Sequence, residues 1–414
     1  MGKYKKIILF QGGVETLDYF SRRMGEEFER LGINVFYFNL KESRQQAKTV
    51  KRFIKPKETM VITFNFEGLE REEGLFSFES GYIWRGYDIP IYNILADHPY
   101  YYHDRFMDLL EDEEHNIGLL KQYHHLSIDK NHVKYMQEYY PDFTNDGFFP
   151  LAGSILNEDY NNLMDAAMEN GIPIAERPRD IVFAGNYTHP SYFDKFIHQT
   201  NEEYADFYQG IIDELISNPQ KTVEEAETAH CIKEMGEQSK EDMRLAMHRM
   251  IFVDLYVRNY YRGKVVSKLV NEGFKVTVVG KDWDKLDVKM PNRLEIINQC
   301  NSAECLRIIK TARLSLNVMP WFKNGAHDRV FNSILNGTVS FSDDSKFIKQ
   351  VLPEGAGVFY YDLKKPDEMC KKLSNLLEDV DKLEEALVIG KNKVQKKHTW
   401  AQRAREILNL ADFE

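Results

Sequence analysis

Residues 324–337, NGAHDRVFNSILNG, have the composition of a phosphate-binding turn. They follow a strand-like run at 313–321, and Val330, Phe331 and Ile334 then recur at helical spacing. A strand, a small-residue loop and a helix beginning with His-Asp-Arg would point backbone N–H groups at an anion. The alternative is a plain turn between a buried strand and a packed helix, and the segment alone does not decide between them.

Other glycine-containing loops also follow strand-like runs in the second half of the chain. In open α/β sheets ligands bind beyond the carboxyl ends of the strands, and glycine lets the backbone approach them closely. Each glycine taken alone is better explained as a turn residue. Taken together, the loops predict a diphosphate pocket made of Gly185, Asn186, Gly280, Lys281, Gly325, His327, Asp328 and Arg329.

Asn332 and one further loop could contact the rest of such a ligand. Asn332 shares a helix face with Asp328, four residues earlier, and its amide could hydrogen-bond a ligand hydroxyl. Asn298 and Gln299 follow another strand-like run.

In the first half, Asp97 and His98 follow the strand-like run IPIYNIL. Pro99 keeps His98 out of helical geometry, and an Asp-His pair at such a point could act as a general base with an orienting partner. A capped helix start with aromatic packing explains the same residues equally well. Gly12 and Gly13, which follow the first strand-like run, could face the same cleft.

The composition excludes several classes of protein. A net charge of −11 argues against broad binding of nucleic acid, and four scattered cysteines do not make a disulfide framework or a zinc site. No segment approaches the length of a membrane span, so we expect a cytoplasmic protein. No metalloprotease motif, serine nucleophile elbow or metal cluster is found.

The alternation of strand-like and helix-like segments predicts two α/β domains, each with a parallel sheet, facing across a cleft. A polar linker at 175–180 separates the halves, which gives an N-terminal domain at 1–175 and a C-terminal domain at 176–398. A charged, helical insertion is expected at about 191–262, and a closing amphipathic helix at 399–414. The expected strands are 5–10, 34–40, 60–66, 89–95, 124–129 and 147–153 in the first domain, and 180–188, 274–283, 294–300, 313–321, 338–343 and 357–361 in the second. A further helical stretch is expected at 161–171.

The run LSLNVMPWFKNGAHDRVFNSILNGTVSFSD (314–343), with FAGNYT (183–188) and VVGKDW (278–283) upstream, resembles glycosyltransferases of the GT-B fold. It is most similar to the CgeB-like, spore-maturation-type group. The resemblance covers about 274–400, and HTWAQRAREIL (398–408) is similar to the family's last helix, which crosses back towards the first domain.

This resemblance implies transfer of a sugar from a nucleotide-sugar donor, with the donor in the C-terminal domain, the acceptor in the N-terminal domain and no bound metal. The glycine loops and the helix start would then contact phosphate and sugar, and the nucleobase would lie near Asn298 and Gln299. Many retaining relatives carry two glutamates eight positions apart where this chain has Asn324 and Asn332. The second would contact the donor ribose, and the change leaves the anomeric outcome and the donor open.

We therefore expect a metal-independent glycosyltransferase without a cofactor, using a UDP-sugar and an unidentified glycan, protein or small-molecule hydroxyl. Asp97 or His98 would deprotonate the acceptor, with Gly12 and Gly13 on the acceptor side. Two alternatives remain open at this point: a sugar-nucleotide epimerase or hydrolase of the same fold, and a non-catalytic carbohydrate-binding or assembly protein. The helical insertion is the expected surface for a protein partner or a second copy of the chain.

Overall fold

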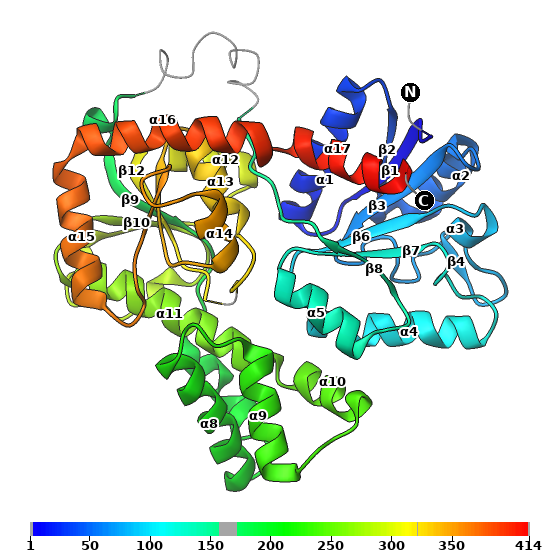
Figure 1. Cartoon of the computed structure of the whole chain (residues 1–414), viewed down its shortest axis with the longest axis horizontal. Coiled ribbons are helices and arrows are strands. Elements are labelled where there is room, and N and C mark those ends of the chain that lie inside the picture. The colour runs from blue at the N-terminus through cyan, green and yellow to red at the C-terminus, as the bar shows by residue number, and fades with distance from the viewer. Residues whose placement is uncertain (1–2, 157–171, 321, 413–414) are drawn as a thin grey trace. The chain divides into compact units, whose positions relative to one another are not determined.

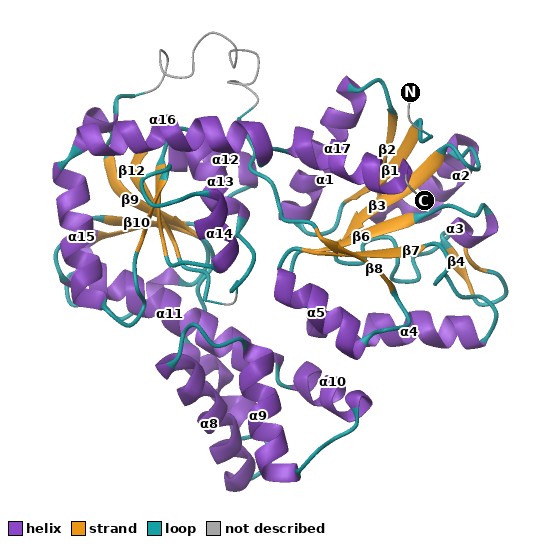
Figure 2. Ribbon diagram, in the orientation of Figure 1, coloured by secondary structure: helices purple, strands orange, loops and turns teal. Residues whose placement is uncertain are grey.

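The computed structural model describes residues 3–156, 172–320 and 322–412. The chain forms two compact units, Met1–Leu151 with Trp400–Glu414, and Ala152–Thr399. Each unit contains one parallel six-stranded sheet covered by helices, as the strand and helix pattern of the sequence predicted (Figures 1 and 2). The contacts divide the chain at 151/152, whereas the sequence predicted the first boundary at 175/176.

The first sheet has the strand order β2-β1-β3-β6-β7-β8, and all neighbouring strands run parallel. The central strand β3 is buried at all six positions because helices cover both faces of a parallel sheet. The last strand differs from the prediction of 147–153: β8 begins earlier, and the chain leaves the sheet after Phe148. The strands are β1 (Lys6–Gln11), β2 (Asn34–Asn39), β3 (Thr59–Phe64), β6 (Ile91–Leu95), β7 (Tyr123–Ser127) and β8 (Thr144–Phe148).

The helices of the first unit include the C-terminal one, which packs on α1. Trp400 at its start lies with its ring centroid 5.2 Å from that of Phe20 and 6.1 Å from that of Phe64. A short antiparallel hairpin, β4 (Phe76–Ser77) with β5 (Gly81–Tyr82), was not predicted. The helices are α1 (Glu15–Arg30), α2 (Ser43–Phe53), α3 (Ile83–Gly86), α4 (His103–Glu114), α5 (Lys130–Tyr139) and α17 (Trp400–Asp412), with 3₁₀ turns η1 (Leu40–Glu42) and η2 (Pro99–Tyr102).

The second sheet has the order β11-β10-β9-β12-β13-β14, again all parallel. Numbered from its first strand this is 3-2-1-4-5-6, the order of dinucleotide-binding sheets. All six strands coincide with predicted runs. They are β9 (Arg179–Ala184), β10 (Val276–Val279), β11 (Leu294–Ile297), β12 (Ala312–Asn317), β13 (Val339–Ser342) and β14 (Val358–Tyr360).

The predicted helical insertion between β9 and β10 is present, although its last helix continues beyond 262 to Asn271. Figure 1 shows α8, α9 and α10 gathered beside α11, away from the sheet. The predicted helix at 161–171 lies outside the described residues. The helices of this unit are α7 (Asp194–Ile197), α8 (Glu202–Ser217), α9 (Val223–Met235), α10 (Lys240–Arg249), α11 (Ile251–Asn271), α12 (Ser302–Lys310), α13 (Asp328–Leu335), α14 (Lys346–Val351), α15 (Pro366–Glu378) and α16 (Val380–Lys397), with 3₁₀ turns η3 (Ile174–Glu176), η4 (Pro190–Phe193), η5 (Trp283–Lys285) and η6 (Pro291–Arg293).

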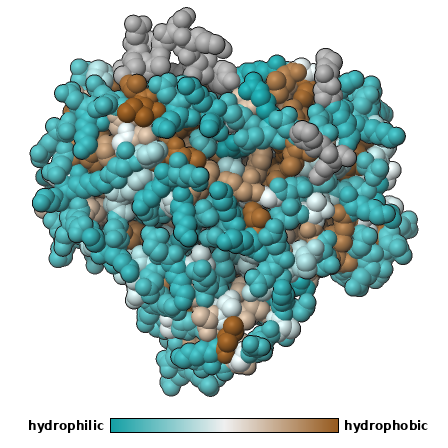
Figure 3. All heavy atoms as spheres, viewed as in Figure 1, coloured by the Kyte–Doolittle hydropathy of each residue, from teal (hydrophilic) through white to brown (hydrophobic). Residues whose placement is uncertain are grey.

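In the face drawn in Figure 3, hydrophilic residues cover most of the described surface and hydrophobic residues show in small separate groups. Within the described ranges, no helix is both long and apolar enough to cross a membrane.

Candidate functional site

The candidate site lies at the carboxyl edge of the second sheet, between β9 and β12. The chain leaves β9 towards β10 on one side, whereas β12 lies on the other side, so the connections diverge at this point. Ligands of open parallel sheets bind at such switch points. The loops after β9, β10 and β12 are therefore the expected ligand-binding loops of this unit.

Two glycine turns meet directly at this edge. Gly185 N donates to Val279 O at 2.9 Å, and Lys281 N donates to Asn186 Oδ1 at 3.0 Å. Gly280 has φ +155°, and a Cβ there would lie 2.4 Å from Gly185 O. Only glycine fits at position 280, because both the conformation and the backbone neighbour exclude a side chain.

An aromatic layer fixes these turns. Trp283 is buried, its Nε1 donates to Gly185 O at 2.8 Å, and its ring stacks on Tyr187 at a centroid distance of 4.9 Å. Phe183, at the end of β9, meets Trp283 edge-on at 5.5 Å. The glycine backbone is thus held in one position. The N–H groups of Gly185, Gly280 and Lys281 already donate to Val279 O, Ile297 O and Asn186 Oδ1, so an anion at this edge would rely on neighbouring cationic side chains.

Arg329, in the first turn of α13, lies against the Gly185 turn. The residue is 7% exposed, and its Nη1 donates to Asn317 Oδ1 at 2.6 Å. The guanidinium lies 5.1 Å from the centroid of the Phe183 ring, and a Cβ on Gly185 would be 3.3 Å from Nη2. Asn317, the last residue of β12, therefore orients a buried cation at the switch point.

His327 and Asp328 extend this arrangement. His327 Nε2 lies 3.1 Å from Arg329 Nη2, and Nδ1 lies 2.6 Å from Asp328 Oδ1. Nδ1 also accepts from Arg329 N at 3.2 Å, so the His327 ring caps the first turn of α13 while it contacts Asp328 and the Arg329 guanidinium. Burial and the Arg329 charge lower the pKa of His327 to about 4, so the ring is neutral at pH 7. Burial opposes ionisation of Asp328, but its contacts with His327 and Arg329 hold the pKa of Asp328 below the usual value.

Asn332 is committed to the protein itself. Its Nδ2 donates to Asp328 Oδ2 at 2.8 Å, and its Oδ1 accepts from Ser154 N at 2.7 Å. Both ends of the amide thus have partners within the second unit. Asn324 lies half-exposed in the loop before α13, and in the same loop Gly325 O accepts from the Ser345 hydroxyl.

Asn298 and Gln299 follow β11, the edge strand that is two places from β9. Both are exposed, so they can contact a ligand without rearrangement. The structure therefore groups Gly185, Asn186, Gly280, Lys281, His327, Asp328 and Arg329 through direct contacts, with Asn298 and Gln299 further along the same edge.

In the first unit, Gly12 and Gly13 form a turn whose N–H groups already have acidic partners. Gly12 N donates to Asp18 Oδ2 at 2.9 Å, and Gly13 N donates to Asp18 Oδ1 at 3.3 Å. The next N–H, of Val14, donates to Glu67 Oε1 at 3.0 Å. This turn presents carboxylates rather than free N–H donors.

Asp97 and His98 turn in different directions. Asp97 Oδ2 accepts from Asn65 Nδ2 at 3.2 Å and from Tyr102 OH at 3.3 Å, and Asp97 is half-exposed. His98 is 8% exposed; its Nδ1 accepts from Tyr100 N at 3.3 Å and its ring packs against His132. Their catalytic role stays a prediction, with Asp97 the more accessible of the two.

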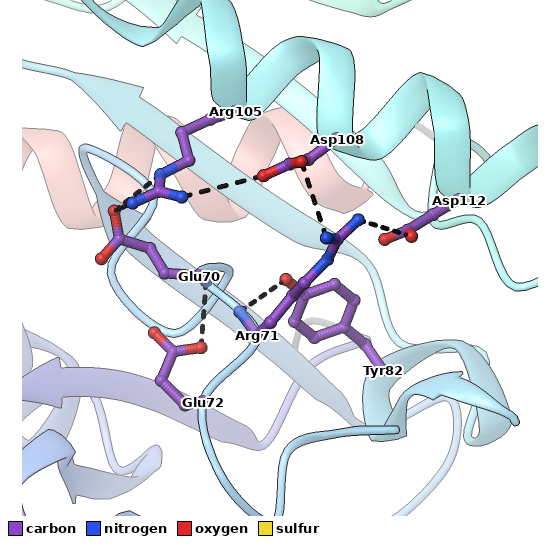
Figure 4. Close-up of polar contacts among 7 residues, drawn as sticks. All are labelled: Glu70, Arg71, Glu72, Tyr82, Arg105, Asp108 and Asp112. Atoms are coloured by element: carbon purple, nitrogen blue, oxygen red, sulfur yellow. Dashed lines mark hydrogen bonds and ion pairs between the residues drawn. The ribbon is translucent and has the colours of Figure 1, made fainter. Parts of the chain in front are cut away.

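The loop after β3 carries a charged network that pins it to α4 (Figure 4). Arg105 Nη2 pairs with Glu70 Oε1 at 2.8 Å, and Arg71 Nη2 pairs with Asp112 Oδ1 at 2.9 Å. Glu70 N donates to Glu72 Oε2 at 3.0 Å. These contacts fix the loop that begins with Asn65 and Glu67.

Sequence reasoning missed Asn317 and Glu67 as candidates, whereas Trp283 lies in the run VVGKDW (278–283) that carried the resemblance. Glu67 carried a usable signal, because it directly follows the strand-like run MVITFNF, as the other candidates follow theirs. Among the described residues, no three His, Cys, Asp or Glu side chains are grouped as metal ligands.

Comparison with known proteins gives the fold. Residues 262–409 match a family model described as glycosyl transferase-like, and no curated protein matches the chain. The chain is similar to an alpha-glucosyltransferase solved in complex with UDP (TM-score 0.58, 10% identity, 99% of each chain). It is also similar to the sucrose-phosphate synthase of Thermosynechococcus elongatus (TM-score 0.52, 10% identity, 98% of each chain). These likenesses show the fold, two Rossmann-like domains as in GT-B glycosyltransferases, and the family match covers residues 262–409.

Proposed function

We propose that this protein is a glycosyltransferase that moves a sugar from a nucleotide-diphosphate sugar to an acceptor hydroxyl. The observation that carries the proposal is the position of buried Arg329 beneath the Gly185 turn, at the switch point of the second sheet. The glycosyl transferase-like match over 262–409 includes Arg329, Gly280 and Lys281 and supports the same reading.

The diphosphate would lie against Gly185, Gly280 and the start of α13. There the Arg329 guanidinium, the exposed Lys281 and the N-terminal end of the helix dipole would stabilise the negative charge of the departing nucleotide. A similar structure with bound UDP supports uracil as the base, which would reach Asn298 and Gln299. Asn324 and Asn332 stay candidates for binding the donor sugar and ribose. Asn332 would have to exchange one of its present hydrogen-bond partners to do so.

We propose further that the reaction needs no metal and no cofactor, that the protein belongs to the CgeB-like group, and that it is located in the cytoplasm. A glycan or protein acceptor would bind to the first unit near Gly12, Gly13, Asp97 or His98. The insertion helices α8–α10 are the proposed surface for a protein partner or second copy.

Thermal unfolding with nucleotides tests the proposal. We expect UDP to raise the melting temperature by several degrees and uridine, which lacks the diphosphate, to raise it little, since a ligand that binds only the folded state stabilises it in proportion to occupancy. GDP, CDP and dTDP, tested in parallel, identify the base. If no nucleoside diphosphate shifts the transition at millimolar concentration, the proposed function is wrong.

A further inference from the structure

The first unit has a switch point of its own, between β1 and β3. The chain leaves β1 for β2 on one side and reaches β3 on the other. The loops after these two strands, Gly12–Val14 and Asn65–Glu67, touch through the hydrogen bond from Val14 N to Glu67 Oε1. By the same rule that locates the candidate site on the second sheet, this edge is expected to bind a ligand.

The backbone before Glu67 is strained and firmly held. Asn65 and Phe66 have φ values of +49° and +66°, which side-chain-bearing residues rarely adopt. Phe66 N donates to the buried Asn93 Oδ1 at 3.1 Å, and the Thr63 hydroxyl donates to Glu67 O at 2.5 Å. Strain that the surroundings maintain in this way is found at functional positions.

Glu67 itself has one carboxylate oxygen without a partner. The residue is 8% exposed, Oε1 accepts from Val14 N, and buried Oε2 has no hydrogen-bond partner in the described part of the chain. The carboxylate fits only because position 13 is glycine, since a Cβ there would lie 2.1 Å from Oε1. A buried polar atom of this kind is costly unless something binds it. Burial accordingly raises the pKa of Glu67 to about 7, against the effect of the Val14 hydrogen bond.

The surroundings decide what can bind there. Asp18 already occupies the N–H groups of Gly12 and Gly13, and Asp97 follows the neighbouring strand β6. A phosphate or carboxylate would meet these negative charges without free donors. A neutral or cationic hydroxyl compound can instead donate its hydroxyl proton to Glu67 Oε2.

We propose that Glu67 is the proton acceptor for the acceptor hydroxyl, and that the acceptor carries no negative charge at this position. The step rests on the proposed function. The hydroxyl proton goes to Oε2, the hydroxyl oxygen bonds to the anomeric carbon of the donor, and the bond from that carbon to the diphosphate oxygen breaks, so the nucleoside diphosphate leaves with the electron pair.

Release of UDP from UDP-glucose, UDP-galactose or UDP-N-acetylglucosamine, with water as acceptor, tests this step. Glu67→Gln keeps an oxygen for Val14 N but cannot take up the proton, so we expect release from the best of these donors to fall about 100-fold or more. In the native protein the rate should rise with pH through an apparent pKa near 7 and then level off, and this dependence should disappear in Glu67→Gln.

Glu73→Gln is the matched control. Glu73 is a carboxylate of the same loop, but its side chain is 71% exposed and its Oε1 lies 3.5 Å from Arg44 Nε. We expect its rate to stay within about threefold of native, as for a substitution that removes no group used in the transition state. Melting temperature and UDP binding of both variants check that they fold.

Three results would overturn the inference while the proposed function stands: Glu67→Gln within threefold of native, an equal loss in Glu73→Gln, or UDP binding without UDP release from any of the three donors. Failure of every nucleotide to bind would instead count against the proposed function.

Discussion

The two sheets of this protein differ in strand order, but each has a switch point at its carboxyl edge, and the charge placed there is different. At the β9/β12 edge the glycine turns adjoin Arg329 and Lys281, and Arg329 is held by the neutral side chain of Asn317. At the β1/β3 edge the glycine turn adjoins Asp18 and Glu67, and its N–H groups point at their carboxylates. One edge suits an anionic ligand, whereas the other suits an uncharged or cationic one.

The difference shows that the fold alone does not assign the ligand. A glycine turn after the first strand occurs in both units, and in each the sheet order creates a switch point. The N–H groups of Gly185, Gly280 and Lys281 have partners within their unit, as those of Gly12 and Gly13 do, so the charge of the side chains beside each turn is what distinguishes the two edges. We therefore base the donor and acceptor assignments on these contacts, residue by residue.

The largest difference between the two edges is expected in the free energy of unfolding when one methyl group is added to a glycine of each turn. In Gly280→Ala the new Cβ would lie 2.4 Å from a backbone oxygen that cannot move, at φ +155°. We expect it to lower the free energy of unfolding by about 4 kcal/mol, as the sum of strain and overpacking. In Gly13→Ala the Cβ would lie 2.1 Å from Glu67 Oε1, a side-chain atom that can move away at the loss of its hydrogen bond from Val14 N, so we expect about 2 kcal/mol.

Urea unfolding of the full chain measures both changes, and Gly273→Ala is the control for backbone strain alone. Gly273 has φ +92° and nothing within 4 Å of an added Cβ, so its expected cost is about 1 kcal/mol. Equal losses for positions 13, 273 and 280 would show that the Gly185–Gly280 contact is not a tight point of the fold.

A smaller effect is expected from the charge of Glu67 on stability. Its pKa is raised from 4.5 to about 7 in the folded protein, so the folded state favours the protonated carboxyl. The stability that this proton provides is present below pH 4.5 and is lost as the pH rises through 7. Glu67→Gln should therefore be more stable than the native protein by about 3 kcal/mol at pH 8 and by less than about 1 kcal/mol at pH 5.

Denaturant unfolding at the two pH values checks this prediction, with Glu73→Gln measured alongside. A Glu67→Gln variant that is less stable than the native protein at pH 8 would mean that the carboxylate is well satisfied in the fold. Glu67 would then not be an unsatisfied group at the β1/β3 edge, and the contrast with the β9/β12 edge would weaken.

The sequence predicted the fold well because both sheets are made of short apolar runs ended by glycine or polar residues. All six strands of the second sheet and five of the first coincide with predicted runs. The sixth, β8, was misplaced because its residues, Thr144–Phe148, are largely polar and half-exposed, whereas the apolar run after it does not join the sheet. The hydrophobic pattern of a sequence indicates which residues are buried. An edge strand is only partly buried, so its pattern is weak.

The candidate site was only partly predictable. The loops after β9 and β10 could be found because residues that follow parallel strands meet at one edge. The contacts of Asn332 with Ser154, 178 positions away, could not be found, since no local pattern reports a partner so distant in sequence. The separate directions of Asp97 and His98 also depend on tertiary contacts, with Tyr102 and His132.

Calorimetric titration of UDP into native protein and Arg329→Ala tests most directly whether the β9/β12 edge holds a diphosphate. Arg177→Ala is the control, because Arg177 contacts Ala312 O and Thr338 at the opposite, amino edge of the same sheet. We expect Arg329→Ala to weaken UDP binding by about 2 kcal/mol, roughly 30-fold, from the loss of charged hydrogen bonds, and Arg177→Ala to leave it unchanged. Equal UDP affinity in native protein and Arg329→Ala would contradict the assignment.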